Sequence, residues 1–141
     1  MSIPERRVRT LFDEAAIAKR NTELAREILS ANPENLLVVA VLKGSFMFAA
    51  DLLRALHRVG LSPQVEFVHL SSYRTGTVST AVLLEKPGKR AVTIDADFVG
   101  FTCPDVFVVG YGMDAAHAFR QLPFVGVVDF DSGDPDLFDE A

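Results

Sequence analysis

The first candidate for chemistry is the triplet Lys43-Gly44-Ser45, which lies between the apolar run 36–42 and a segment with helical spacing. In an open parallel sheet, ligands bind beyond the carboxyl ends of the strands, and a helix that begins there offers free N–H groups to an anion. The glycine would let the backbone approach such a ligand, and the lysine would add positive charge. An ordinary turn with Ser45 as helix N-cap explains the triplet equally well. The spacing is too short for a P-loop.

A second candidate is the segment 107–114, where a strand ends in a turn flanked by Gly110 and Gly112. The aromatic ring of Phe107 could stack on a planar base while the neighbouring backbone pairs with the polar edge of that base. The carboxylate of Asp114 could hold Mg²⁺, directly or through water. The local pattern alone favours plainer roles, with Phe107 in the core and Asp114 capping a following helix.

The third candidate is Lys86, at the end of the apolar run 81–85 and just before Pro87-Gly88. Its side chain would project from the rim of a sheet, where it could donate a hydrogen bond to a carbonyl oxygen on a bound ring. A lysine in this position is more often a solvated loop charge.

The elements that must position these residues alternate between helix and strand. The run 36–42 is rich in β-branched residues and suits a strand buried on both faces, as in a parallel sheet. Together with the next helix, which Gly60 ends, and the next strand, it predicts a βαβ unit with a right-handed crossover. No linker or repeat interrupts the pattern, so we expect one α/β domain over residues 1–141. The expected helices are 7–30, 46–59 and 114–122, and the expected strands are 36–42, 65–70, 81–85, 98–101, 106–109 and 125–130.

Composition narrows the classes of function. The chain has 141 residues, 49% of them hydrophobic, and a net charge of −5. An acidic chain without a basic stripe is a poor candidate for nucleic-acid binding, and no apolar run is long enough to span a membrane. Cys103 is the only cysteine, which fits a reducing compartment and predicts a cytoplasmic protein. The acidic tail 131–141 reads as a solvated terminus.

Taken together, the segments resemble the hypoxanthine/guanine phosphoribosyltransferases, within the type I phosphoribosyltransferase family, over nearly the whole chain. The resemblance implies a mostly parallel sheet flanked by helices. It also implies purine salvage, in which 5-phosphoribosyl passes from phosphoribosyl pyrophosphate to hypoxanthine or guanine, giving IMP or GMP plus pyrophosphate. The matching stretches are Val-Leu-Lys-Gly-Ser-Phe-Met-Phe-Ala-Ala-Asp-Leu at 41–52, Ser-Ser-Tyr at 71–73 with Gly-Thr at 76–77, Leu-Leu-Glu-Lys-Pro at 83–87, Asp-Phe-Val-Gly-Phe at 97–101, Pro-Asp at 104–105, the segment 107–114, and Arg-Gln-Leu-Pro-Phe at 120–124.

The resemblance also implies roles around the pyrophosphate. Lys43 and Gly44 would cradle it, across a Lys43–Gly44 peptide bond that the family often holds cis, and Arg120 would bind it. Ser72 and Tyr73 would belong to the catalytic loop that closes over the reaction and excludes water.

Around the purine, the resemblance implies that Lys86 donates a hydrogen bond to the exocyclic oxygen of hypoxanthine or guanine. Adenine carries an amino donor at that position and would be rejected. Phe107 would stack on the base, and the backbone of Val108 would read its edge. Asp114 would lie at the purine site and help to place Mg²⁺.

One part of the family pattern is missing. Two acids, apolar residues and then Asp-Ser/Thr-Gly-x-Thr hold the ribose and its 5′-phosphate in the family and supply the presumed general base. The only partial match, at 131–133, lies after the purine segments, and we do not accept it. The motif belongs between Thr80 and Ala81, where roughly 30 or more residues are lacking by the usual size of a βαβ unit. An omitted stretch, an engineered deletion and a natural loss each explain this. We favour the first, because losing a central strand would expose both of its neighbours.

The leading hypothesis is therefore the enzyme. The alternative is a catalytically inactive purine- or nucleotide-binding relative that lacks the ribose-phosphate loop. The resemblance further implies a homodimer or homotetramer, and the preference among hypoxanthine, guanine and xanthine stays open.

Overall fold

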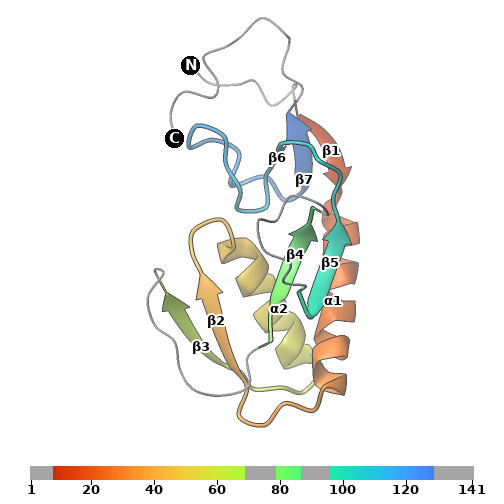
Figure 1. The fold of residues 1–141 in the computed structure, drawn as a ribbon, viewed down its shortest axis with the longest axis vertical. Helices are drawn as coiled ribbons and strands as arrows, with labels where there is room; N and C mark the ends of the chain where they lie inside the picture. The colour runs from red at the N-terminus through yellow and green to blue at the C-terminus, as the bar shows by residue number, and fades with distance from the viewer. Residues whose placement is uncertain (1–7, 69–78, 87–95, 129–141) are drawn as a thin grey trace, which may run out of the picture.

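The structure is a computed structural model that describes residues 8–68, 79–86 and 96–128. Ser72, Tyr73 and the acidic tail 131–141 lie outside the described residues. Neither described helix has the length and apolar character needed to cross a membrane. The described elements, shown in Figure 1, are β1 Val8–Phe12, α1 Glu14–Ser30, β2 Leu37–Val41, α2 Phe46–Arg58, β3 Gln64–Val68, β4 Ala81–Glu85, β5 Phe98–Thr102, β6 Val108–Val109 and β7 Val125–Val128.

Two parallel strand pairs form the middle of the described structure. β2 pairs with β3, and β4 pairs with β5. The parallel strands of the expected βαβ unit are confirmed, since α2 connects β2 to β3. In Figure 1 the arrows of both pairs point toward the same end of the molecule, where β6 and its turns lie. No hydrogen bonding joins β2 to β4 among the described strands, so the two pairs are separate sheets.

β2 is not buried on both faces, which corrects the prediction for this strand. Ala40 is 5% exposed and Val38 packs against the core, but Val39 and Val41 are 46% and 53% exposed. Successive side chains of a strand point to opposite faces, so one face is packed and the other is open. The second face is exposed because no described element covers it. On β3, Phe67 is 61% exposed.

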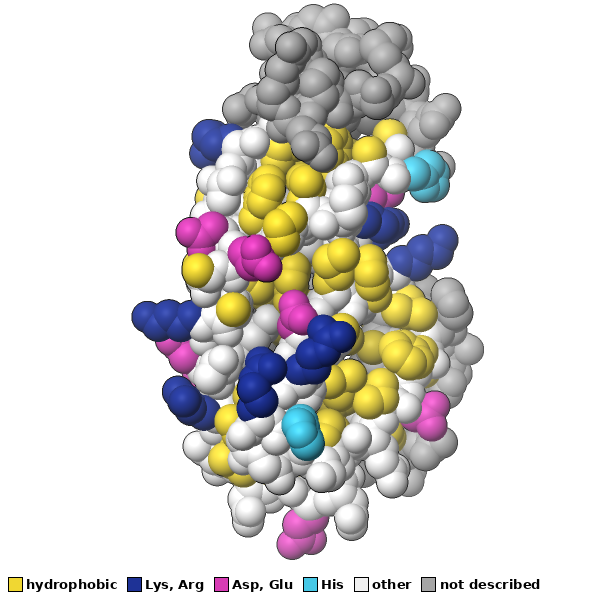
Figure 2. Space-filling view, turned by 180° about the vertical axis from the view of Figure 1, so that it is seen from behind, with side chains coloured by type: hydrophobic (Ala, Val, Ile, Leu, Met, Phe, Trp, Pro, Cys, Tyr) yellow, Lys and Arg dark blue, Asp and Glu magenta, His cyan; other side chains and the backbone are white. Residues whose placement is uncertain are grey.

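The surface carries further apolar groups. Seen from behind in Figure 2, hydrophobic side chains lie open to solvent over much of the described surface, with Lys and Arg side chains grouped near its middle. Phe46 and Leu29 are among the large hydrophobic residues that remain about two-fifths exposed, at 42% and 40%.

The third sheet is antiparallel, in the order β1-β7-β6. The expectation that the first helix begins at residue 7 is wrong, because Val8–Phe12 pairs with β7 instead. The apolar residues of this segment fit the spacing of a helix and that of a strand equally well. Pairing with β7, more than a hundred residues later in the chain, selects the strand. The helix begins after Asp13, whose Oδ1 accepts a hydrogen bond from the Ala16 N–H at 2.7 Å and caps α1.

The main core forms where the two helices pack together against the strands. Gly60 ends α2 as predicted, with a φ of +97°. The N–H groups of Gly60 and Leu61 donate to the carbonyls of His57 and Leu56, both at 3.0 Å, which is a Schellman motif. The buried residues of this core are Ile17, Leu24, Ala25, Phe48, Leu52, Ala55, Leu56, Leu83, Tyr111 and Val125.

The expected helix over 114–122 does not form. Ala116, His117 and Phe119 have positive φ values of 49°, 63° and 76°. Ala115 and Ala118 exchange both backbone hydrogen bonds across a tight turn, at 3.1 and 3.0 Å. The helical spacing misled because the apolar residues of this segment pack into a second core as turns. That core consists of Val109, Ala115, Phe119, Leu122 and Val128.

Arg20 ties α1 to β5. Its Nε donates to the carbonyl of Gly100 at 2.6 Å and its Nη2 to that of Val99 at 2.7 Å. Its Nη1 pairs with Glu23 at 2.9 Å and with Glu27 at 3.1 Å. One guanidinium therefore fixes the helix against the strand that precedes the candidate site.

Candidate active site

The loop after β2 carries the predicted Lys43-Gly44 pair. A cis peptide bond is present, but it joins Leu42 to Lys43 and not Lys43 to Gly44 as the resemblance implied. The Ser45 hydroxyl donates to the Val41 carbonyl at 2.5 Å. Ser45 stands at the N-cap position of α2, as the alternative predicted, but its side chain makes no capping hydrogen bond. The Lys43 side chain is exposed at the carboxyl end of the strand.

The turn after β6 is a two-residue hairpin. Gly110 and Met113 exchange backbone hydrogen bonds at 2.9 and 3.1 Å. The residues between them, Tyr111 and Gly112, have φ values of 50° and 96°. Positive φ at both central positions is the signature of a type I′ turn. The turn is anchored further because the Tyr111 N–H donates to the Leu122 carbonyl at 2.8 Å.

This turn meets the Lys43-Gly44 loop directly. A Cβ atom placed on Gly112 would lie 2.7 Å from the Gly44 carbonyl oxygen. A Cβ atom on Gly44 would lie 3.8 Å from Cγ of Met113. Only glycine fits at position 112, both for this contact and for the positive φ.

Arg120 and Asp114 adjoin the same turn. Arg120 Nη1 donates to the Gly112 carbonyl at 2.6 Å, and the Gly112 N–H donates back to the Arg120 carbonyl at 2.9 Å. Arg120 Nη2 lies 3.2 Å from Oδ1 of Asp114, and both side chains are partly buried. Oδ2 of Asp114 accepts from the His117 N–H at 3.1 Å, so the carboxylate caps a turn where a helix was expected.

Lys86 leaves the end of β4 and reaches the segment before β6. Its Nζ donates to the Val106 carbonyl at 2.7 Å, which places the ammonium group beside Phe107 and Val108 in the chain. Phe107 is 43% exposed and is therefore not the core residue that the local pattern favoured. Val108 is part of β6 and pairs with Val127.

Two buried titratable groups lie near these residues. Burial raises the pKa of the Cys103 thiol, while the positive charge of Lys86 lowers it by less. Burial also raises the pKa of the Tyr111 hydroxyl, and its hydrogen bond to Asp51 raises it further. Both groups therefore stay protonated at neutral pH, and the thiol is shielded from reaction.

Sequence reasoning missed this tyrosine and the residues it binds. The Tyr111 hydroxyl donates to Oδ2 of Asp51 in α2 at 2.5 Å and accepts from Nδ2 of Asn21 in α1 at 3.0 Å. A polar residue on the apolar face of α1 was the only signal available in the sequence.

The structure thus gathers the predicted residues into two groups. One contains Gly44, Arg120 and Asp114 around the Gly112 turn, with Lys43 preceding Gly44 in the same loop. The other contains Lys86, Phe107 and Val108. Lysines from the carboxyl ends of β2 and β4 supply both groups, and this is the end of a parallel sheet where ligands bind.

The arrangement can bind an anion beside a flat ring. Arg120 supplies positive charge beside Gly112, and Lys43 is exposed in the adjoining loop. Lys86 supplies a donor at Val106, the residue before Phe107. In the parts of the chain that the structure describes, no group of three or more His, Cys, Asp or Glu side chains could hold a metal ion by itself.

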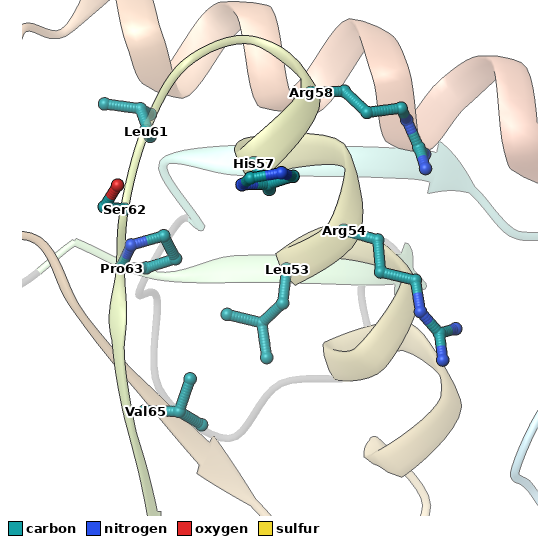
Figure 3. A pocket seen from close by; sticks show the side chains of 8 residues that line it. All are labelled: Leu53, Arg54, His57, Arg58, Leu61, Ser62, Pro63 and Val65. Atoms are coloured by element: carbon teal, nitrogen blue, oxygen red, sulfur yellow. The ribbon is translucent and has the colours of Figure 1, made fainter.

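A separate hollow between α2 and the start of β3 does not share this chemistry (Figure 3). Leu53, Pro63 and Val65 face it, whereas the side chains of Arg54 and Arg58 point away from its apolar floor. Its lining also includes His57 and Ser62, but none of the predicted site residues lies along it.

Comparison with known proteins identifies relatives, although no family model matches the chain. It is 31% identical over 172 residues to hypoxanthine phosphoribosyltransferase of Escherichia coli (strain K12), covering 86% of this chain and 95% of the relative. It is 30% identical over 174 residues to the enzyme of the same name from Buchnera aphidicola subsp. Schizaphis graminum, covering 87% and 97%. The structure of hypoxanthine phosphoribosyltransferase from Trypanosoma cruzi with the product IMP superposes with a TM-score of 0.81 at 27% identity, covering 90% and 93%.

The length of these alignments is informative. The match to the Escherichia coli protein extends over 172 residues, whereas this chain has 141 in total. The relative therefore carries residues inside the aligned region that have no counterpart here. The identity and coverage nevertheless span nearly the whole of both chains, in a fold with parallel strands flanked by helices. The chain belongs to the hypoxanthine phosphoribosyltransferase family.

Proposed function

We propose that the protein acts in purine salvage and transfers 5-phosphoribosyl from phosphoribosyl pyrophosphate to hypoxanthine or guanine. A purine ring nitrogen forms the new bond to C1 of the ribose, the C1–oxygen bond to pyrophosphate breaks, and the nitrogen loses its proton. The observation that carries the proposal is the contact of Gly112 with the Gly44 carbonyl, because it brings the Lys43 loop, Arg120 and Asp114 together. The relatives' shared name gives no support to the inactive alternative.

The purine would bind at Lys86, Phe107 and Val108. The ammonium group has three donors and spends one on the Val106 carbonyl, so two remain for the exocyclic oxygen of the base. Hypoxanthine and guanine present an acceptor at that position, whereas adenine presents a donor. The exposed ring of Phe107 offers a stacking surface.

Pyrophosphate would bind between Lys43, Gly44 and Arg120, where charge neutralisation stabilises the leaving group. Mg²⁺ commonly binds through one or two carboxylates together with substrate phosphates, and the single carboxylate of Asp114 fits that donor set. When bound, Mg²⁺ would neutralise charge on the pyrophosphate oxygens. The ion pair between Arg120 Nη2 and Asp114 Oδ1, at 3.2 Å, keeps the two side chains next to each other, which supports this proposal.

The proposal includes a further segment between Thr80 and Ala81, within a single domain of residues 1–141. Three observations support it: the alignments longer than the chain, the lack of hydrogen bonding between β2 and β4, and the exposed face of β2. A strand placed between β2 and β4 would unite the two parallel pairs into one sheet. The segment would hold the ribose phosphate and supply the general base, and Ser72 and Tyr73 would close over the site.

The remaining parts of the proposal concern assembly and location. The enzyme would be a cytoplasmic homodimer or homotetramer that acts on small molecules. The mass in solution, measured by light scattering, tests the assembly.

The central experiment measures GMP and IMP formation with phosphoribosyl pyrophosphate and Mg²⁺. Two proteins are compared: the 141-residue chain, and a version that receives the corresponding segment of the Escherichia coli relative between Thr80 and Ala81. We expect nucleotide from the second protein with guanine or hypoxanthine but not with adenine.

The purine site is tested by Lys86→Met in the second protein. The control is Lys19→Met, a substitution of the same type on the exposed face of α1. Loss of a charged hydrogen bond should weaken purine binding about tenfold or more, whereas Lys19→Met should change nothing. Absence of turnover from both unsubstituted proteins with either base would overturn the proposed function.

A further inference from the structure

Three elements meet at one hydroxyl group. Tyr111, from the turn after β6, is 5% exposed and lies between the two helices. Its hydroxyl is 2.5 Å from Oδ2 of Asp51 in α2 and 3.0 Å from Nδ2 of Asn21 in α1. Asn21 is 2% exposed and is the buried polar residue of α1.

The chemistry of the groups fixes the direction of both hydrogen bonds. An ionised carboxylate only accepts, so the hydroxyl must give its proton to Asp51. The Asn21 amide must then present its NH₂ group to the hydroxyl oxygen. Among the described residues, this leaves Oδ1 of Asn21 buried without a hydrogen-bond partner. A buried amide with an unpaired oxygen carries a cost that simple packing does not require.

Tyr111 is followed in the chain by Gly112, which contacts the residues proposed to bind pyrophosphate. Gly112, the next residue, touches the Gly44 carbonyl on one side and exchanges hydrogen bonds with Arg120 on the other. The purine residue Lys86 is held elsewhere, by the Val106 carbonyl. Anchoring the Tyr111 side chain therefore fixes Gly112, which lies among the residues proposed to bind pyrophosphate. The hydrogen-bond partners of the Tyr111 hydroxyl are not among the residues proposed to bind the purine.

We propose that Tyr111, with Asn21 and Asp51, is a positioning residue that fixes the Gly112 turn between the Lys43-Gly44 loop and Arg120. Its hydroxyl thereby governs affinity for pyrophosphate and not affinity for the purine. The second statement rests on the proposed function, whereas the first concerns the fold alone.

The test uses Tyr111→Phe, which removes the hydroxyl and keeps the ring. Amide hydrogen exchange without ligand tests whether Tyr111 positions the turn. We expect faster exchange at 110–113 and 43–46, and unchanged exchange around Leu24 in α1. Titration calorimetry tests the second statement, with Mg-pyrophosphate and guanine as separate probes. We expect the Kd for Mg-pyrophosphate to rise about tenfold, as for loss of one hydrogen bond, and the Kd for guanine to change less than about twofold.

Two controls separate positioning from general stability. Val128→Ala truncates the second core, away from the hydroxyl, and should lower stability while affecting both Kd values equally or not at all. Asp51→Asn keeps an acceptor for the hydroxyl and should retain most of the pyrophosphate affinity.

The outcomes are distinguishable. Equal loss of both ligands in Tyr111→Phe, or exchange that rises throughout the core, would overturn the positioning role. An unsubstituted chain that binds neither probe would count against the proposed function. The exchange pattern would then decide alone whether Tyr111 positions the turn.

Discussion

At the scale of single residues, the Tyr111 hydroxyl links stability to pH. The free phenol ionises near its ordinary pKa of 10.0, and burial raises the pKa in the folded protein. The folded state therefore binds this proton more tightly than the unfolded state. The resulting stabilisation is complete below the unfolded pKa and is lost as the pH rises through the folded pKa.

We predict that the free energy of unfolding falls above about pH 10, with a slope from this group approaching about 1.4 kcal/mol per pH unit. Tyr111→Phe removes this contribution. Urea unfolding of both proteins from about pH 8 to about pH 11 measures the difference, because the lysines titrate equally in each. Parallel pH profiles for the two proteins would show that the hydroxyl is not protected in the folded state.

Prediction from sequence worked best for side chains near a strand end. Gly44, Asp114 and Arg120 are candidates from the sequence alone, and the structure places all three around the Gly112 turn, with Lys43 next to Gly44 in the chain. Their catalytic and binding roles remain predictions. Tyr111 was missed because its partners lie 60 and 90 residues away in the chain, and no local pattern reveals such a pairing.

At the scale of elements, the site depends on turns with positive φ. Gly112 and Gly60 have nearly the same φ, 96° and 97°, but different surroundings. A Cβ on Gly60 would meet nothing within 4 Å, whereas one on Gly112 would meet the Gly44 carbonyl. The two glycines therefore form a matched pair that separates backbone strain from contact.

We predict that Gly60→Ala lowers the free energy of unfolding by about 1–2 kcal/mol, the cost of the left-handed conformation. Gly112→Ala should cost roughly 3 kcal/mol or more, because the overpacked contact adds to that strain. Urea unfolding measures both, and calorimetry with Mg-pyrophosphate should show a loss only for Gly112→Ala. If both substitutions lowered the free energy of unfolding equally, the loop around Gly44 would have to move aside at little energetic cost.

The boundaries of elements show where local patterns are sufficient. The strand over 81–85 matched β4 to the residue, since its apolar run ends in a charge and a proline. The segments 8–12 and 114–122 were misjudged, because tertiary contacts chose between equally good periods. Val8–Phe12 gains a strand partner, and 114–122 closes over β6 and β7 as turns.

At the scale of the whole molecule, the separation of the two parallel pairs is the main departure from expectation. Val39 and Val41 would be buried in a continuous sheet with a covered face, as the sequence indicated, but both are about half exposed. Their apolar character would be explained if a helix of the proposed segment packed on this face of β2 while its strand paired between β2 and β4.

We predict that inserting the relative's segment between Thr80 and Ala81 raises the free energy of unfolding by about 2 kcal/mol, from burial of two half-exposed valines. It should also slow amide exchange in β2 and β4. A Gly/Ser-rich insert of the same length is the control and should do neither. Unchanged exchange in β2 with the relative's segment would place that segment elsewhere.

Three cationic side chains each donate a hydrogen bond to a main-chain carbonyl: Arg20 to Gly100, Lys86 to Val106 and Arg120 to Gly112. A main-chain carbonyl oxygen is present whatever the side chain, so a substitution that leaves the backbone conformation unchanged keeps the acceptor. Drift in the side chain at position 106 therefore cannot abolish the acceptor that aims Lys86. Under the proposed function, side chains around the base could therefore change, and with them the choice among oxopurines, while the main-chain acceptor that orients Lys86 stays the same.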